Sequence, residues 1–415
     1  MLKKIKTTDV RLGMHVQSLC GNWLDHPFWK SKFLLTDPTE LAQLQASAIE
    51  ACWIDVSRGL DVAPAALTVP PDGAPPPPAA ARPNAAADAG PKAATGFDEE
   101  LRAAAALVRA SRQAVMTLVG QARLGHAINI EQCLPVVGDI TESVWRNPQA
   151  LVSLARLKTH DDYSYMHSVA VCALMVALAR RLGHDESSAR EAGLAGLLHD
   201  MGKATMPLAI LNKPGKLSDA EFLVIRSHPE RGHQLLRTSL CASPMALDVC
   251  LHHHERPDGK GYPFGAGGDA LSRAARMGAV CDVYDAITSN RPYKAGWDPA
   301  ESIAKMADWT RSGQFDRVVY AAFVSSLGIY PTGSLVRLQS GRLAVVVEQN
   351  DGALMKPRVR VFYSTRSQLP VARELLDLNA PGCNDRIVGR ESNADWKFSG
   401  LDELWAGAEV LARRR

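Results

Sequence analysis

The chain has 415 residues, a length that favours two or three domains over a single core. Apolar residues make up 46% and charged residues 22%, as in ordinary soluble globular proteins. The formal net charge of +3 lacks the strong basic bias of nucleic-acid-binding proteins, so no nucleic-acid partner is expected. Eight cysteines without a C-x-x-C pair indicate neither a disulfide framework nor a zinc ribbon.

No segment has the length and hydrophobicity of a membrane span. The longest apolar stretch, Val169–Ala179, is about half of the roughly 20 residues that a spanning helix needs. The N-terminal segment Met1–Val10 is charged and lacks the apolar centre of a secretory signal. We therefore expect a cytoplasmic protein.

Residues 1–61 are expected to form a small α+β domain, because short strand patterns surround one helical pattern. The strand patterns cover Val10–Leu19, part of the aromatic segment Trp23–Phe33, and Cys52–Val56, and the helical pattern covers Pro38–Ile49.

The next stretch, residues 62–96, is rich in Ala and Pro and has little to bury, so we expect an extended or disordered linker. From residue 97 to residue 330, apolar residues recur at helical spacing, which predicts a helical domain. The helical patterns cover Glu99–Val119, Ile140–Leu157, Tyr165–Leu182, Glu186–Leu198 and Asp219–Leu236.

Residues 331–415 change character again. Strand patterns cover Leu335–Arg337, Leu343–Glu348 and Arg358–Tyr363, with Gly and Asn-Asp-Gly turns between them. We expect a small β-rich C-terminal appendage, and the whole chain is predicted to be multidomain and mainly α.

Histidines and carboxylates cluster in the helical region. Eight of the twelve histidines fall between His167 and His254, and several neighbour Asp or Glu. Imidazoles and carboxylates together suit iron, manganese or zinc, and a carboxylate can bridge two ions. The clusters stand roughly 25–30 residues apart, so each one can come from a different helix of a bundle.

Simpler explanations exist for single members of this set. His126, His160, His184 and His233 are ordinary surface or hydrogen-bonded candidates. The pair His199-Asp200, taken alone, is explained equally well as a polar helix end. The complete set favours a metal site, because so many buried polar groups would otherwise be unsatisfied.

The motifs His199–Lys203 and Gly261–Pro263 resemble the two signatures of the HD-GYP family of cyclic di-GMP phosphodiesterases. The resemblance extends in order from Tyr163 to Phe323. It includes Tyr165–Ser168, Leu211–Leu217, His228–Glu230, His253–Pro263, Asp282 and Asn290–Lys294.

The N-terminal region carries a second resemblance. Leu12–Val16, Trp23–Phe28 and Cys52–Val56 resemble a small domain of unknown function often found ahead of such modules. A regulatory or dimerising role and a folding spacer are both open alternatives.

The resemblance implies an all-helical HD-superfamily bundle that holds two divalent ions. Iron or manganese is expected, with zinc, nickel and magnesium as alternatives. Some family members have a glutamate four residues before the first histidine, where it supports a third ion. This chain has Tyr163 there, which favours two ions, with Asp162 as a substitute ligand, and His252 is expected to be structural. The implied ligands are His167, His199, Asp200, His228, His253, His254 and Asp282.

We hypothesise that a hydroxide between two ions about 3.5–4 Å apart hydrolyses cyclic di-GMP to the linear dinucleotide or GMP. The resemblance suggests that Asp200 bridges the ions, with His167, His199 and Asp282 completing one site and the other histidines the second. Lys203 would neutralise charge on the phosphate or leaving oxygen, and Asp285 would orient a histidine or Lys203. The residues expected around the substrate are Lys203, Gly261, Tyr262, Asp285, Arg291 and Lys294.

Two other functions compete with this hypothesis. An HD-superfamily hydrolase of another nucleotide would not require Gly261–Pro263 or Arg291–Lys294, and both are present. A non-catalytic receptor or signalling module would be favoured by a missing ligand, and the ligand set is complete. A homodimer or signalling protein partners are open alternatives.

Overall fold

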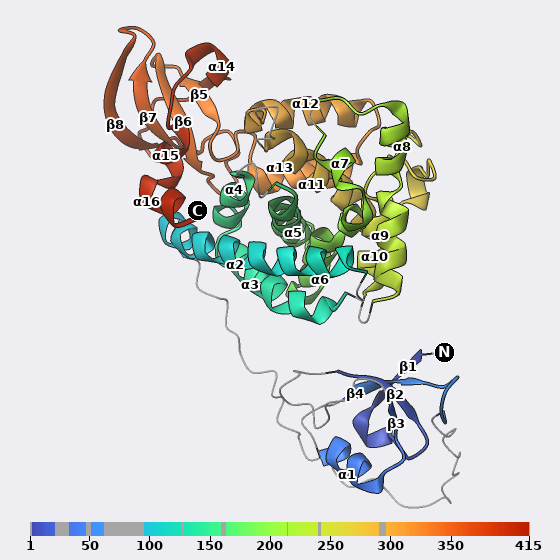
Figure 1. The fold of residues 1–415 in the computed structure, drawn as a ribbon. Helices are drawn as coiled ribbons and strands as arrows, with labels where there is room; N and C mark the ends of the chain where they lie inside the picture. Colours follow the sequence, from blue (N-terminus) through green and yellow to red (C-terminus); the bar gives the residue numbers. More distant parts are fainter. Residues whose placement is uncertain are drawn as a thin grey trace, which may run out of the picture. The chain divides into compact units, whose positions relative to one another are not determined.

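The computed structural model describes most of the chain. The chain divides into two compact units, Met1–Ala87 and Asp88–Arg415 (Figure 1). The described residues of each unit have their own hydrophobic core. The described residues are 2–20, 33–46, 51–61, 95–125, 128–158, 163–213, 215–239, 242–289 and 296–414. Most of the expected aromatic segment Trp23–Phe33 lies outside them.

The first unit is a four-stranded antiparallel sheet in the order β1-β4-β2-β3 with one α-helix. Strand β1 was not expected, because three of its five residues are lysines and the segment shows no clear apolar alternation. Ile5 of this strand is buried. The elements are β1 (Leu2–Lys6), η1 (Thr7–Asp9), β2 (His15–Cys20), β3 (Phe33–Leu34), α1 (Pro38–Ala46) and β4 (Ala51–Asp55).

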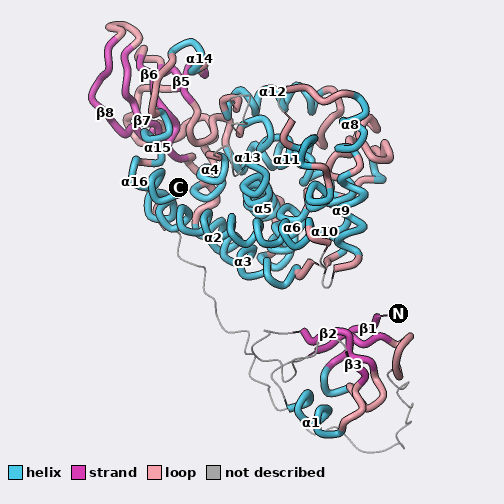
Figure 2. Tube along the Cα trace, viewed as in Figure 1, coloured by secondary structure: helices cyan, strands magenta, loops and turns pink. Residues whose placement is uncertain are grey.

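The second unit is mainly helical, as expected, and its strands gather at one end (Figure 2). Its helices before the sheet are α2 (Phe97–Arg123), η3 (Ile130–Cys133), α3 (Leu134–Arg146), α4 (Ala150–Arg156), α5 (Tyr163–Arg181), α6 (Glu186–Leu198), η5 (Met201–Thr205), α7 (Leu208–Leu211), α8 (Asp219–Arg226), α9 (His228–Arg237), α10 (Pro244–His252), η6 (Gly268–Ala270), α11 (Arg273–Thr288), α12 (Pro299–Arg311) and α13 (Arg317–Leu327).

Two helices expected to be continuous are each broken near a proline. The helix expected over Ile140–Leu157 divides into α3 and α4, because Asn147 precedes Pro148 and adopts an extended conformation. The Asn147 side chain then accepts hydrogen bonds from the first N–H groups around α4. The helix expected over Asp219–Leu236 divides into α8 and α9 just before Pro229.

Helix α5 forms the centre of the bundle. It contacts α2, α3, α4, α6, α11 and α13, and Figure 1 shows it enclosed by neighbouring helices. Every residue of the apolar stretch Val169–Ala179 is buried, which accounts for its hydrophobicity as core packing. Among the described helices, none combines the length and apolar character that crossing a bilayer requires.

The C-terminal residues form a five-stranded antiparallel sheet in the order β8-β7-β6-β5-β9. Two of these strands and three short helices were not expected from the sequence. One face of β6, which carries Leu343 and Val345, joins the core of the helical bundle. The elements are β5 (Leu335–Leu338), β6 (Arg342–Glu348), β7 (Arg358–Ser364), β8 (Leu369–Asp377), β9 (Ile387–Arg390), α14 (Asn393–Trp396), α15 (Leu401–Ala406) and α16 (Ala408–Arg414).

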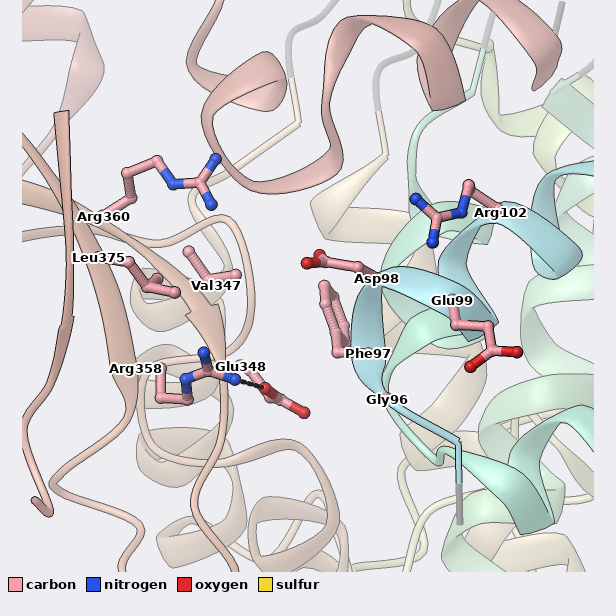
Figure 3. A pocket seen from close by; sticks show the side chains of 10 residues that line it. All are labelled: Gly96, Phe97, Asp98, Glu99, Arg102, Val347, Glu348, Arg358, Arg360 and Leu375. Atoms are coloured by element: carbon pink, nitrogen blue, oxygen red, sulfur yellow. Dashed lines mark hydrogen bonds and ion pairs between the residues drawn. The ribbon is translucent and has the colours of Figure 1, made fainter. Parts of the chain in front are cut away.

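A pocket of about 290 Å³ lies between this sheet and the start of α2 (Figure 3). Three arginines and three carboxylates line it together with apolar side chains, and Arg358 pairs with Glu348 at 2.6 Å. None of the site residues expected from the sequence lines this pocket.

Candidate metal centre

The structure brings all seven expected ligands together from separate helices and helix ends. They form two groups, and within each group one candidate ligand atom per residue lies within 4.8 Å of the others. Arg291, Lys294 and Asp162 lie outside the described residues, as does the side chain of Tyr163. The first group is His167, His199 and Asp282, and the second is Asp200, His228, His253 and His254.

Asp200 lies between the two groups and presents one carboxylate oxygen to each. Its Oδ2 atom is 3.5 Å from Nε2 of His167 and 3.4 Å from Nε2 of His199. Its Oδ1 atom is 3.2 Å from Nε2 of His228 and 3.7 Å from Nε2 of His253. This arrangement suits a carboxylate that bridges two cations.

Helix ends fix the orientation of three imidazoles. The last carbonyls of a helix have no N–H partner within the helix, so they can accept from a side chain. Nδ1 of His199 donates to the carbonyl oxygen of Gly196 at 2.7 Å, and Nδ1 of His253 donates to that of Cys250 at 3.0 Å. In the neutral tautomer that these bonds require, Nε2 carries no proton and is directed toward the centre.

The third of these imidazoles depends on the break between α8 and α9. Pro229 has no N–H group, so it cannot donate to the carbonyl of Ile225 four residues earlier. Nδ1 of His228 donates to this carbonyl oxygen at 2.8 Å. The proline that divides the expected helix thus leaves an acceptor that orients a candidate ligand.

The donor set fits divalent cations. Nε2 of His228 and Nε2 of His253 lie 3.3 Å apart, although both rings use Nδ1 as the donor. Two lone pairs that face each other at this distance repel, and a cation between them removes the repulsion. Oδ1 of Asp200 is buried and accepts no hydrogen bond from any described residue. Such an orphaned carboxylate oxygen is costly without a cation.

His167 is oriented by a carboxylate instead of a helix end. Its Nδ1 atom donates to Oδ2 of Asp285 at 2.6 Å. Lys158, whose side chain is fully buried, forms an ion pair with the same Asp285 oxygen and donates to Oγ of Ser289 at 2.8 Å. Asp285 therefore lies behind His167, away from the position expected for a substrate contact. Lys158 was not expected from the sequence, because an isolated lysine forms no pattern.

The site keeps its carboxylates anionic and two of its imidazoles neutral. Burial alone would raise the pKa of Asp200, but Lys203 and the nearby imidazoles outweigh it and lower this pKa well below its ordinary value. Burial likewise acts against ionised Asp282, yet the imidazoles of His167 and His199 beside it lower its pKa well below its ordinary value. Burial lowers the pKa of His228 to about 4 and that of His254 well below its ordinary value. These protonation states are the ones that bind cations.

Two glycines allow the close approaches that assemble the site. A Cβ on Gly202 would lie 1.8 Å from the carbonyl oxygen of His228, so only glycine lets η5 approach α9 here. A Cβ on Gly261 would lie 2.4 Å from Cα of Glu255. Gly261 thus packs against the backbone that follows His254, and its role is to bring the next residue, Tyr262, close to that histidine.

Lys203 and Tyr262 lie at the edge of the centre. Nζ of Lys203 is 2.6 Å from Oδ2 of Asp200, and its side chain is 33% exposed. The ring of Tyr262 stacks on the ring of His254 with centroids 4.6 Å apart. Arg226, which was not expected from the sequence, lies over the Tyr262 ring.

Comparison with known proteins decides the family. The chain is 53% identical over 413 residues to a curated cyclic di-GMP phosphodiesterase of Pseudomonas aeruginosa, covering 98% of this chain and 96% of that protein. This chain belongs to the HD-GYP family. Residues 145–319 of this HD-GYP protein match the family described as an HD domain, and residues 2–133 match a domain of unknown function, DUF3391.

Two further relatives match less than half of this chain. A cyclic di-GMP phosphodiesterase response regulator of Xanthomonas campestris is 37% identical over 43% of this chain and 47% of its own length. A 3'3'-cGAMP-specific phosphodiesterase of Vibrio cholerae is 33% identical over 42% of each chain.

Proposed function

We propose that this HD-GYP protein is a metal-dependent phosphodiesterase that hydrolyses cyclic di-GMP. The observation that carries the proposal is the pair of His/Asp groups with Asp200 between them. The full-length similarity to the Pseudomonas aeruginosa enzyme supports the choice of substrate.

The first group, His167, His199 and Asp282, would hold one divalent ion, and His228, His253 and His254 would hold the second. Asp200 would contact both. Nitrogen and oxygen donors of this kind suit iron and manganese, with zinc, nickel and magnesium as alternatives. When bound, the ions supply Lewis acidity that polarises the phosphodiester and activates water.

Lys203 and the surrounding side chains complete the proposed chemistry. Lys203 forms an ion pair with Asp200 and is partly exposed. Its ammonium group can therefore neutralise charge that develops on a phosphate oxygen. Asp285 and Lys158 act behind His167 and keep its ring in place. Among the described residues, Lys203 offers an ammonium group to the substrate. Arg291 and Lys294, expected from the sequence to contact the substrate, lie outside the described residues.

The test uses purified full chain loaded with iron or manganese and supplied with cyclic di-GMP. We expect hydrolysis to the linear dinucleotide or GMP, and Asp200→Asn should lower kcat by roughly 100-fold or more, the scale of losing one key electrostatic group. Asp248→Asn is the matched control, since this carboxylate pairs with His252 at 2.9 Å outside both groups. A metal-loaded wild-type protein that leaves cyclic di-GMP intact would reject the function.

A further inference from the structure

Arg226 is the last residue of α8 and stands two positions before His228. It is half-buried, and its guanidinium carbon lies 4.8 Å from the centroid of the Tyr262 ring and 5.9 Å from that of the Phe222 ring. Contacts with the faces of two aromatic rings hold this guanidinium group in place.

Arg226 is connected to the candidate metal centre through the ring of Tyr262. Tyr262 stacks on His254 at a centroid distance of 4.6 Å and an interplanar angle of 29°. The Tyr262 N–H donates to the carbonyl oxygen of His254 at 3.2 Å, so backbone and ring both fix the tyrosine. The series Arg226, Tyr262, His254 therefore extends from α8 to a candidate ligand.

The N–H donors of this guanidinium have no acceptor among the described residues. Arg226 has no hydrogen bond or ion pair with the described residues, whereas comparable half-buried arginines do: Arg256 pairs with Asp258 at 2.6 Å and Arg276 with Asp316 at 2.8 Å. A guanidinium carries five donors in a planar fork. An arginine held by aromatic rings beside a reaction centre, with its N–H donors unpaired among the described residues, is suited to bind an acceptor pair on a ligand.

We propose that Arg226 selects the base of the substrate by donating to the O6 and N7 atoms of one guanine. The inference rests on the proposed function. Guanine presents two acceptors along this edge, which match the arginine fork, whereas adenine presents a donor at its N6 position. The aromatic surroundings of Arg226, which are Tyr262 and exposed Phe222, suit a base, and Lys203 is the group placed for phosphate.

The experiment compares full-length, metal-loaded wild type with Arg226→Ala, Arg226→Lys and the control Arg231→Ala. Arg231 is an exposed arginine on the neighbouring helix α9. The quantities measured are kcat and KM for cyclic di-GMP, cyclic di-AMP and the mixed guanine–adenine dinucleotide. If a substrate turns over too slowly, its inhibition constant against cyclic di-GMP replaces KM.

Arg226→Ala should lower kcat/KM for cyclic di-GMP roughly 10-fold or more, the discrimination that one bidentate base contact provides. The change should appear mainly in KM, and the values for cyclic di-AMP should stay within about threefold. Arg226→Lys keeps the charge but not the fork, so it should lose the same selectivity, and Arg231→Ala should match wild type. Unfolding midpoints confirm that the variants are folded.

Equal losses for guanine and adenine substrates would overturn base selection, and so would full selectivity in Arg226→Lys or Arg226→Ala. Failure of the proposed function has a different signature, because wild type itself would then hydrolyse none of the three dinucleotides.

Discussion

The strength of a histidine ligand in this centre depends on the partner of the ring nitrogen that faces away from the metal groups. Nδ1 of His199, His228 and His253 bonds a neutral backbone carbonyl, whereas Nδ1 of His167 bonds the carboxylate of Asp285. An anionic partner makes an imidazole a stronger ligand. A buried carboxylate in turn needs a positive partner, which explains the fully buried Lys158.

Lys158→Met should therefore weaken metal binding without touching a ligand. The substitution leaves Asp285 buried without a cation, so burial would raise its pKa and loosen its bond to His167. We expect a 10- to 100-fold weaker metal affinity, the usual scale for a residue that orients a ligand. Breaking one side of a buried ion pair should also cost about 3–5 kcal/mol of unfolding free energy. Metal titration and thermal unfolding measure the two effects.

Glu100→Gln separates metal binding from general instability. Glu100 is buried on α2, away from the metal groups. Its carboxylate accepts hydrogen bonds from Nε of Arg146 and Oγ of Ser143, both at 2.7 Å. This control should be destabilised yet bind metal with wild-type affinity. Wild-type affinity in Lys158→Met would show that Lys158 serves stability alone.

At the scale of elements, local patterns predicted the helical bundle. The residues that converge in the centre were implied by the resemblance of short motifs to the HD-GYP family. Apolar spacing did not predict the helix breaks at Asn147 and Ser227, because the spacing continues across both positions. It also missed Lys158, whose partner Asp285 is 127 residues away. A single basic residue has no periodicity, so its role appears only when the helices are packed.

Gly202→Ala tests how closely η5 must approach α9. The added Cβ would meet backbone atoms, at 1.8 Å from the His228 oxygen and 2.7 Å from N of Gly232, so the two elements must move apart. Their separation would draw Asp200 away from His228. We expect a loss of about 1–3 kcal/mol or more in unfolding free energy, as for overpacking, together with lost metal occupancy.

Gly138→Ala is the matched control for Gly202→Ala. Gly138 lies inside α3, and a Cβ there would meet nothing within 4 Å. Because alanine favours helix over glycine, this variant should gain up to about 1 kcal/mol. Retained metal and stability in Gly202→Ala would show that the backbone contact has room to relax.

At the scale of the whole molecule, one face of the C-terminal sheet is part of the helical core. The same buried cluster includes Phe97 of α2, Val345 of β6, and Trp405 and Val410 of α15 and α16. Helix α16 contacts α2, and α15 contacts β6. Strand patterns predicted part of this sheet, but which face packs on the bundle depends on residues far apart in the chain. The first unit has a separate core around Val16, outside this cluster.

These cores predict opposite results for two fragments. Residues 88–415 keep the second core complete, so this fragment should fold, bind metal and unfold in one cooperative transition. Residues 88–330 lose Leu343, Val345, Val347, Leu404 and Trp405, all buried in the shared cluster. Burial of each large side chain contributes about 1.5–3 kcal/mol, and a domain has only about 5–15 kcal/mol of net stability. The shorter fragment should therefore aggregate, or its unfolding midpoint in calorimetry should lie at a far lower temperature than that of the longer fragment. Equal unfolding midpoints would instead show that the bundle is stable without the sheet.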